Sequence, residues 1–338
     1  MEHSPIDAAV QRGQALPQGL CVLGLGLIGG SVLRAASDLL PVSGWSPSES
    51  TRAEAAASGA QIHPTLEQAL AWAVDRDALV MLASPVTGFE SMLRKITAKA
   101  PEVLLTDVGS VKASVARQVT AIAPRTRYVG GHPMAGTSAS GFAAADPDLF
   151  RGAAWVTCLQ QSSNPIAWDC VAALALALGS HVVPVTAADH DSAVARISHL
   201  PHLLALALAQ VAASGTPLTR TLAASSFRDG SRVAGTRPEL VQAMCEANRD
   251  ALVDAFDESL GILGVARGTL ASTGSLGKTV EAGHRGFLSM QQEPATTEVT
   301  LNNPTIDDLL TLGADGGYIT GLLRTAQERI VTGIGPVN

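Results

Sequence analysis

Three glycines near the N-terminus have the spacing of a phosphate-binding turn. Gly24, Gly26 and Gly29 follow an apolar run that starts at residue 20, and they precede a helical pattern. The first glycine allows a sharp turn, the second leaves room for a pyrophosphate, and the third lets the helix pack closely on the strand. The N–H groups at the start of that helix favour negative charge. This order predicts a dinucleotide-binding fold.

Histidines form the second group of candidate residues. His132 follows a strand-like segment, and a neutral imidazole there has a pKa suited to acid–base chemistry near neutral pH. His199 and His202 form a His-x-x-His pair that could suggest a metal. A zinc site needs three or four protein ligands. Only the segment 189–191 could supply a further ligand beside His199 and His202, and only if the helix folded back. We therefore expect no metal.

The composition indicates a globular protein with two domains. The chain has 338 residues, 46% of them hydrophobic, and a net charge of −7 with no basic stripe. We find neither the ~20 consecutive apolar residues that span a bilayer nor a signal-peptide pattern, and we expect a cytoplasmic protein without membrane or nucleic-acid partners. We expect the four scattered cysteines to be reduced and to behave as small hydrophobic residues. They are Cys21, Cys158, Cys170 and Cys245.

Short apolar runs alternate with helical patterns between residue 20 and about residue 186. The runs lack polar alternation, which is typical of parallel strands buried on both faces. The pattern predicts an α/β domain over 1–186 with a doubly wound, Rossmann-type sheet. Candidate residues follow these strands and should gather at one edge of the sheet. The runs are 20–24, 41–45, 78–83, 103–107, 128–130, 153–159 and 181–185.

The remaining residues, 187–338, have mainly helical patterns and predict an all-α substrate and dimerisation domain. One helix covers about 188–213. Another begins near Thr236, which can cap it while Glu239 reaches back, and an amphipathic stretch covers 238–268. The C-terminal segment, where glycine-rich breaks flank shorter helical pieces, is assigned to the same domain.

Four local motifs occur in a specific order and spacing. They are Gly24-Leu-Gly-Leu-Ile-Gly-Gly-Ser31, Asp107-Val-Gly-Ser-Val-Lys112, Gly131-His-Pro-Met-Ala-Gly-Thr137, and Ser198-His-Leu-Pro-His202 followed by Phe227-Arg-Asp-Gly-Ser-Arg232. Together they resemble the TyrA family of prephenate and arogenate dehydrogenases. The resemblance covers residues 20 to about 265 and implies a nucleotide domain, a helical homodimerisation domain and an active site in the cleft between them. It also implies an oxidative decarboxylation of tyrosine biosynthesis, in which NAD(P)+ takes hydride from C4 of the ring and the C1 carboxylate leaves as CO2.

The resemblance implies roles for individual residues. His132 aligns with the family's catalytic histidine, which takes the proton of the C4 hydroxyl. Ser110 resembles the serine that hydrogen-bonds this hydroxyl, and it could also cap the helix that follows. Arg232 matches the arginine for the ring carboxylate, with Arg228 as the fallback. Further predicted substrate contacts are His202, His199, Ser198, Thr137 and Ser138.

The expected position of the ribose-binding acid contains no carboxylate. Ser46 and Ser48 stand there instead, and Arg52 could neutralise a 2′-phosphate if the loop brings it round. This predicts NADP as the preferred cofactor, whereas Glu49 could still move in to serve NAD. The other predicted cofactor contacts are Gly24, Gly26, Leu27, Ile28, Gly29, Ser31, Ser84, Pro85 and Asp107.

The choice between prephenate and arogenate stays open. Many prephenate-using relatives have a glutamate where this chain has Ser138, so the family's ionic network is altered here. An ammonium group would favour a carboxylate such as Asp229 or Asp146. No segment resembles a ligand-sensing ACT-type domain, and tyrosine feedback would have to act at the active site.

Two other classes of protein are alternatives. Dehydrogenases of the 6-phosphogluconate and 3-hydroxyacid type also join a glycine-rich nucleotide domain to a helical one. They normally use a lysine of the second domain, and no lysine occurs between Lys112 and Lys278. A non-catalytic dimer that senses NADP(H) would need neither a base nor an arginine for the substrate.

Overall fold

The computed structural model describes residues 16–137, 139–325 and 328–337, and the chain divides into two compact units. The first unit contains Met1–His190 and Thr296–Asn338. The second contains Asp191–Ala295.

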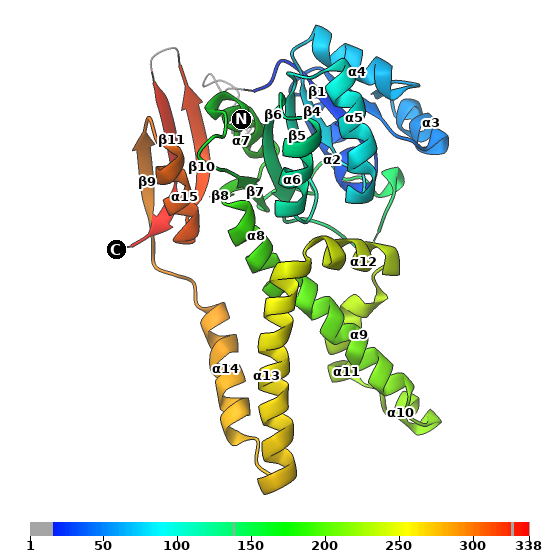
Figure 1. Cartoon of the computed structure of the whole chain (residues 1–338), viewed down its shortest axis with the longest axis vertical. Helices are drawn as coiled ribbons and strands as arrows, with labels where there is room; N and C mark the ends of the chain where they lie inside the picture. The colour runs from blue at the N-terminus through cyan, green and yellow to red at the C-terminus, as the bar shows by residue number, and fades with distance from the viewer. Residues whose placement is uncertain (1–15, 138, 326–327, 338) are drawn as a thin grey trace, which may run out of the picture. The chain divides into compact units, whose positions relative to one another are not determined.

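Within the described residues, the first unit is built on an 11-stranded sheet of order β3-β2-β1-β4-β5-β6-β7-β8-β10-β11-β9 (Figure 1). Strands β1 to β6 are parallel to one another, so their carboxyl ends lie at one edge, as predicted. These strands are β1 (Leu20–Leu23), β2 (Val42–Trp45), β3 (Gln61–Ile62), β4 (Leu79–Leu82), β5 (Leu104–Asp107) and β6 (Arg127–Pro133). The connecting helices are α2 (Leu27–Ala36), α3 (Glu49–Ala57), α4 (Leu66–Asp75), α5 (Phe89–Lys99) and α6 (Ala113–Ile122).

The sheet reverses direction between β6 and β7 (Ala154–Cys158), which corrects the prediction of parallel strands throughout. The two strands pair antiparallel, with His132 opposite Val156. The described part of the connection 134–153 contains a 3₁₀ turn and no helix of crossover length. Parallel strands need such a crossover, and without it the chain returns antiparallel.

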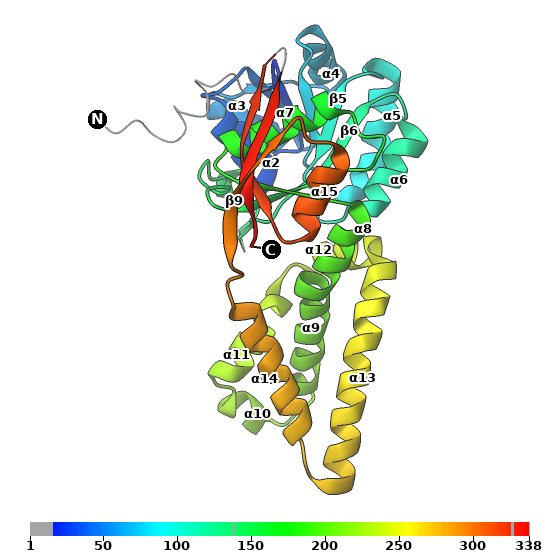
Figure 2. The ribbon, with the colours of Figure 1, turned by 90° about the vertical axis from the view of Figure 1, so that its left-hand side faces the viewer.

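Residues 296–338 also differ from the prediction, because they join the sheet instead of the helical unit. They form β9 (Thr296–Asn302), α15 (Ile306–Ala314), β10 (Tyr318–Arg324) and β11 (Arg329–Pro336) (Figures 1 and 2). Strand β10 pairs antiparallel with β8 (His181–Val185) and so extends the sheet. In β11 the buried residues are Val331, Gly333 and Gly335, so apolar side chains do not recur at every second position and the strand signal in the sequence is weak.

The second unit is helical, as predicted, and Figure 2 shows α13 and α14 as the two arms of a hairpin. The helix predicted at 188–213 is confirmed as α8 (Ala187–Val194), a π turn (Ala195–His199) and α9 (Leu200–Ala213), the π turn lying just before Pro201. The helices after α9 are α10 (Pro217–Leu222), α11 (Ser225–Ser231), α12 (Pro238–Ala247), α13 (Arg249–Thr273) and α14 (Gly277–Gln291), with the 3₁₀ turn η4 (Arg232–Gly235) after α11.

One local prediction in this unit is wrong. The cap predicted at Thr236 is not used, because α12 begins at Pro238 with Arg237 at the N-cap position and no side-chain cap. The stretch predicted at 238–268 is helical and consists of α12 and the first part of α13, with Asn248 between them.

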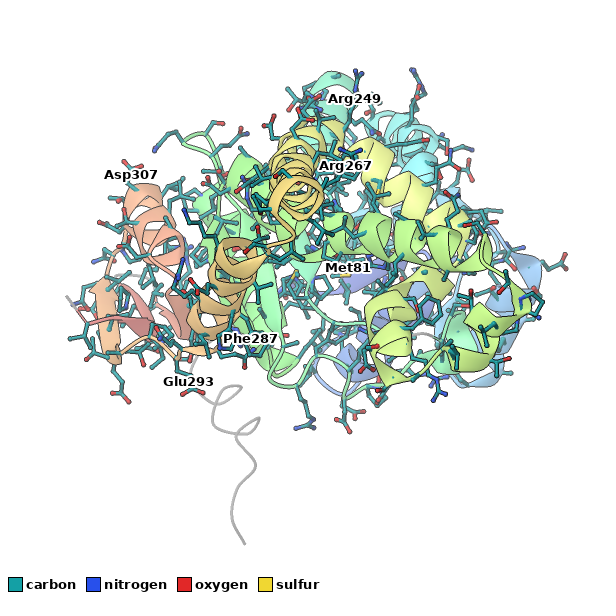
Figure 3. The ribbon with its side chains drawn as sticks, turned by 90° about the horizontal axis from the view of Figure 1, so that it is seen from below. Met81, Arg249, Arg267, Phe287, Glu293 and Asp307 are labelled. Carbon is teal, nitrogen blue, oxygen red and sulfur yellow. The ribbon has the colours of Figure 1, made fainter. Side chains whose placement is uncertain are left out.

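Many large apolar side chains of the helical unit are exposed. On α14, Phe287 (labelled in Figure 3) is 59% exposed and Met290 is 76% exposed. Val211 of α9 is 72% exposed. By length and composition the continuous helix Ala187–Ala213 could cross a membrane, although one such helix is weak evidence for a membrane span.

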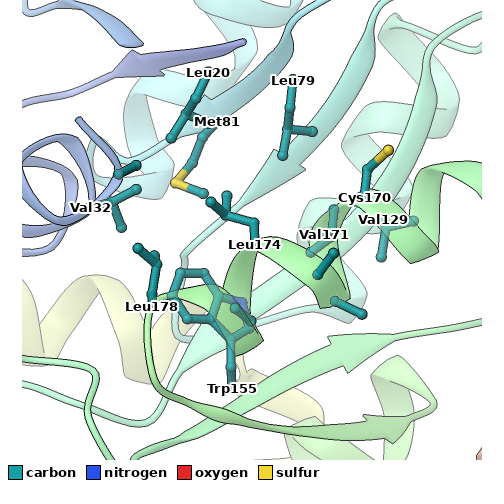
Figure 4. Packing of buried hydrophobic residues seen from close by; sticks show 14 of the residues in the cluster. Leu20, Val32, Leu79, Met81, Val129, Trp155, Cys170, Val171, Leu174 and Leu178 are labelled. Carbon is teal, nitrogen blue, oxygen red and sulfur yellow. The ribbon is translucent and has the colours of Figure 1, made fainter. Parts of the chain in front are cut away.

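The core of the first unit lies between the sheet and helix α7 (Pro165–Ala177), which is buried around most of its circumference. Figure 4 shows Leu174 of this helix near Leu79 and Met81 of the sheet, and Leu178 beside Trp155. Such burial contributes roughly 25 cal/mol per Å² of apolar surface. Burial raises the pKa of Cys21 to about 12, and its protonated thiol donates a hydrogen bond to the Ala69 carbonyl at 3.5 Å.

One carboxylate of α7 ties the C-terminal strands to this core. Asp169 is fully buried and accepts hydrogen bonds from Arg324 and, at 2.7 Å, from Nε of Arg329. The Arg329 guanidinium lies 4.8 Å from the ring centre of Trp168 and also donates to the Pro304 carbonyl at 2.8 Å. The buried charge is therefore compensated by residues more than 150 positions later in the chain.

We predict that Asp169→Ala lowers the free energy of unfolding by about 3 kcal/mol or more, because it leaves two guanidinium groups without their buried partner. Denaturant unfolding of the full chain measures this. The control is Glu102→Ala, which removes an exposed pair with Arg125 and should cost under about 1 kcal/mol. Equal effects of the two substitutions would contradict the anchoring role of Asp169.

Candidate active site

The glycine turn between β1 and α2 has the predicted geometry. Gly24 has φ +116°, and a Cβ there would lie 2.4 Å from the backbone nitrogen of Ser84. A Cβ on Gly29 would lie 1.9 Å from the Gly24 carbonyl oxygen. A Cβ on Gly26 would meet nothing within 4 Å, so this side of the turn is open. Together with the N–H groups of Leu27 and Ile28 at the helix start, the turn fits a pyrophosphate.

Two serines near this turn have different surroundings. Ser31 is fully buried, and its hydroxyl accepts a hydrogen bond from the Asp146 backbone N–H at 2.9 Å. This differs from the predicted cofactor contact, because the hydroxyl ties α2 to the loop after β6. Ser84 and Pro85 follow β4 at the same edge as Gly24, the first half-buried and the second exposed.

Arg52, in the first turn of α3, lies against the loop after β2. Its Nη1 donates to the Ser46 carbonyl at 2.7 Å and to the Pro47 carbonyl at 3.2 Å. Ser48 caps α3 by accepting from the Thr51 N–H, while the buried Ser46 hydroxyl accepts from the Ser48 N–H. Since a guanidinium has five N–H donors, these bonds leave it able to pair with a phosphate as well.

Asp107 lies at the end of β5 and is fully buried. Its carboxylate forms an ion pair with the buried Lys112 and accepts from the Gly109 N–H at 2.8 Å and the Tyr128 hydroxyl at 2.7 Å. Lys112 also donates to the Gly131 carbonyl at 2.6 Å. This differs from the prediction that Asp107 contacts the cofactor, because a carboxylate without exposed surface holds neighbouring protein groups instead.

His132 lies near the end of β6, one residue after the carbonyl that Lys112 binds. Its Nδ1 is 2.9 Å from Nε2 of His190 in α8, and the two rings meet edge to face with centres 5.1 Å apart. His132 is half-buried, whereas His190 is only 3% exposed. The pair orients the His132 ring through one nitrogen, and a base acting through Nε2 must then keep its proton on Nδ1.

The other residues predicted in the first unit lie in loops. Ser110 is half-buried between β5 and α6, and it does not cap α6, which begins at Ala113. Thr137 is exposed and accepts a hydrogen bond from the Ala139 N–H at 3.2 Å. Ser138 lies outside the described residues.

The second unit brings His199 and His202 onto one helix, where each ring has assigned partners. His202 donates from Nδ1 to the Ser198 carbonyl at 2.8 Å, and its Nε2 lies 3.4 Å from the Thr236 hydroxyl. The buried His199 receives a hydrogen bond at Nδ1 from the Asn248 amide at 3.0 Å. In the part of the chain that the structure describes, no three His, Cys, Asp or Glu side chains form a group able to hold a metal.

The two predicted arginines follow each other closely in the second unit. Arg228 lies in α11 and Arg232 is the first residue of η4. Both side chains belong to exposed residues. The 3₁₀ turn η4, which begins at Arg232, packs on α9, the helix that carries His202. An exposed guanidinium is available to a carboxylate ligand.

The glycine turn and the paired imidazoles at the same sheet edge are typical of a dinucleotide-dependent enzyme. Comparison with known families identifies the family to which the chain belongs. Residues 30–184 match the family model for the prephenate dehydrogenase nucleotide-binding domain, and residues 186–266 match that for the prephenate dehydrogenase dimerization domain. The chain belongs to the prephenate dehydrogenase family.

Individual relatives agree with this assignment. The cyclohexadienyl dehydrogenase of Zymomonas mobilis is 31% identical over 75% of this chain and 88% of its own length. The prephenate dehydrogenase of Bacillus subtilis is 33% identical over 71% of this chain, which spans 66% of that relative. A solved structure from Corynebacterium glutamicum, assigned as a prephenate dehydrogenase, is 41% identical, covers 83% of this chain and 91% of its own, and has a TM-score of 0.78.

The sequence patterns do not reveal the partners of two predicted histidines. His190, the partner of His132, is considered there only as a metal ligand within 189–191, although its place on the first turns of a helix that follows a strand is a usable signal. Asn248, the partner of His199, lies inside the amphipathic stretch 238–268 and carries no signal of its own. Neither contact can be inferred from spacing, because the partners are 58 and 49 residues away.

The bond between His132 and His190 predicts a loss of activity when His190 is replaced. His190→Leu should lower kcat/KM by about 100-fold, because the base loses its fixed orientation and tautomer. His190→Gln, whose amide oxygen can still accept from Nδ1, should retain more activity. Reduction of the nicotinamide cofactor with prephenate and with arogenate is the measurement.

The matched control is His181→Leu, which removes a half-buried histidine of β8 whose ring packs on Tyr318. Turnover should be kept in that variant. Equal turnover of His190→Leu and the unaltered chain would show that His132 needs no partner.

Proposed function

We propose that this protein is a prephenate or arogenate dehydrogenase that forms 4-hydroxyphenylpyruvate or tyrosine by oxidative decarboxylation. The observation that carries the proposal is the His132–His190 pair at the sheet edge that also carries the glycine turn. Family membership supports the same reaction class. The proposal extends beyond the family assignment because the chain spans only part of some curated relatives.

We assign the role of general base to His132. As C4 of the substrate ring loses hydride, its hydroxyl loses a proton, and Nε2 of a neutral imidazole can take it. The Nδ1–H then donates to Nε2 of His190 before and after this transfer, so the pair needs no rearrangement during the step. Cleavage of the bond between C1 and its carboxylate releases CO2 and makes the ring aromatic. We place Ser110 as the second hydrogen-bond partner of the hydroxyl.

The substrate carries a carboxylate on the ring and another on its side chain. We assign Arg232 to the ring carboxylate, because a guanidinium binds it with two parallel hydrogen bonds and fixes the ring for the reaction. Arg228 is the fallback. The remaining substrate contacts that we propose are Ser198, His199, His202, Thr137 and Ser138.

The choice between the two substrates depends on which protein group pairs with the substrate's own side chain. That side chain carries a keto oxygen in prephenate and an ammonium in arogenate. An ammonium requires a carboxylate or a neutral acceptor, and Asp229 of α11 is exposed and meets this requirement. Asp146 is less suited, because its Oδ1 already accepts from the Asp148 N–H at 2.9 Å. We therefore include both prephenate and arogenate in the proposal.

We propose NADP as the preferred cofactor, with NAD as the alternative. When bound, the nicotinamide ring accepts the hydride from the substrate. The protein's part is to hold the phosphates at Gly24–Gly29 and to neutralise a 2′-phosphate with Arg52, which already lies against the carbonyls after β2. Glu49, the first residue of α3, is the group that would serve NAD instead.

The helical unit supports a homodimer. Its model match is a dimerization domain, and large apolar residues of α9, α13 and α14 are exposed in the single chain. A second copy covering these faces would remove that surface from water. We assign the apolar helix Ala187–Ala213 to this helix packing rather than to a membrane, and we place the protein in the cytoplasm.

The proposed function predicts different effects at its two principal residues. His132→Asn should lower kcat by about 10²- to 10⁴-fold while the cofactor still binds, because only the base is lost. Arg232→Ala should mainly raise KM for the substrate, because it removes a carboxylate partner. Steady-state assays with both substrates and both cofactors measure these effects, and full turnover by His132→Asn would exclude it as the base.

The position of Arg52 predicts the cofactor preference. Arg52→Ala should raise KM for NADP+ by about 10- to 100-fold, the value of a charge-assisted hydrogen bond of ~1.5–3 kcal/mol, and leave KM for NAD+ nearly unchanged. Arg94→Ala, which removes an exposed arginine of α5 paired with Glu90, is the control. An unchanged KM for both cofactors in Arg52→Ala would favour NAD held by Glu49.

A further inference from the structure

Asn248 is a buried amide at the break between two helices. Helix α12 ends at Ala247 and α13 begins at Arg249, and Asn248 between them has φ −105° and ψ 32°. This conformation is outside the α-helix and turns the side chain inward, where the residue is 4% exposed. A buried amide needs partners for its N–H groups, so its contacts are informative.

The partners of Asn248 fix the orientation of its amide. Nδ2 lies 2.8 Å from the backbone carbonyl oxygen of Asp191. A carbonyl oxygen can only accept a hydrogen bond, so the atom that faces it must be the NH2 group and not the amide oxygen. The same Nδ2 lies 3.0 Å from Nδ1 of His199. The NH2 group has two hydrogens, and each one has an acceptor.

The consequence for His199 is a defined proton position. Because Nδ1 receives a hydrogen from Asn248, Nδ1 must carry a lone pair, and the neutral ring then has its proton on Nε2. An imidazolium would place an N–H against the NH2 group. His199 is 1% exposed, so water cannot easily replace the amide as the partner of Nδ1.

His202, three residues along the same helix, has the opposite pattern. Its Nδ1 faces the Ser198 carbonyl at 2.8 Å and must therefore carry a proton. Its Nε2 lies 3.4 Å from the Thr236 hydroxyl, which can donate to it or accept from it. The two neutral imidazoles are thus held in opposite tautomers.

We propose that Asn248 is a positioning residue that holds His199 as the neutral Nε2–H tautomer, so that His199 serves as a hydrogen-bond donor. The tautomer follows from the contacts of the helical unit alone. Its use in binding substrate rests on the proposed function. A donor at Nε2 can pair with a carboxylate or a keto oxygen and cannot pair with an ammonium.

The direct test is the proton position itself. In the full-length protein with ¹⁵N-labelled histidine, long-range ¹H–¹⁵N correlations separate the two neutral tautomers and the imidazolium. We expect the Nε2–H pattern for His199 at neutral pH, assigned by the signals that disappear in His199→Gln. An Nδ1–H or imidazolium pattern in the unaltered protein would overturn the proposal, with or without enzymatic activity.

Two substitutions extend the test. Asn248→Asp places an acceptor beside Nδ1, and we expect His199 to change to a ring protonated at Nδ1. Asn248→Leu keeps the branched shape at Cγ and removes both hydrogen bonds, and we expect a mixture of tautomers. Gln242→Leu, which replaces an exposed amide of α12, should keep the pattern of the unaltered chain. An unchanged His199 pattern in both Asn248 variants would overturn the proposal.

Kinetics separate a positioning role from a general loss of structure. With prephenate as the substrate, Asn248→Leu should raise KM about tenfold and change kcat much less, because a binding donor is impaired while His132 is untouched. Equal losses in KM and kcat, with lower thermal stability, would assign Asn248 to folding alone. Absence of turnover in the unaltered chain would instead contradict the proposed function and leave the tautomer measurement valid.

Discussion

The buried ion pair between Asp107 and Lys112 is the constraint on which the position of the base depends. Both side chains are almost fully buried, and such a pair is tolerated only when its remaining hydrogen-bonding capacity is used. Gly109, Tyr128 and Gly131 supply those further partners. The pair therefore joins the end of β5 to β6 immediately before the candidate base.

The glycine before that base is required by the same packing. A Cβ on Gly131 would lie 2.7 Å from the backbone oxygen of Asp107, so a larger residue would push β6 away from β5. Lys112 holds the Gly131 carbonyl, and the following residue, His132, then reaches His190 with its Nδ1. A lysine that is buried and already paired in this way is poorly placed for acid–base chemistry, which leaves the imidazole as the better group.

Sequence reasoning succeeded where the controlling contacts are local. The roles of Gly24 and Gly29 follow from a strand, a turn and a helix that are adjacent in the chain, and the geometry confirms both. The edge that carries His132 follows from the parallel order of β1 to β6. The partners of the imidazoles were not predictable, because His190 and Asn248 meet them across about 50 residues, through a strand reversal and a helix break that periodicity does not encode.

The C-terminal strands show how far such long-range dependence extends. Helix α7 is apolar on nearly every side, which suits a helix covered by a sheet on one face and by further chain on the other. Its one buried carboxylate, Asp169, would be costly without Arg324 and Arg329. Since residues 296–338 lie beyond both matched family regions yet complete this core, they are part of the nucleotide unit rather than an appended domain. The sheet that positions His132 thus depends on charge compensation by Arg324 and Arg329, which lie more than 150 residues after Asp169 in the chain.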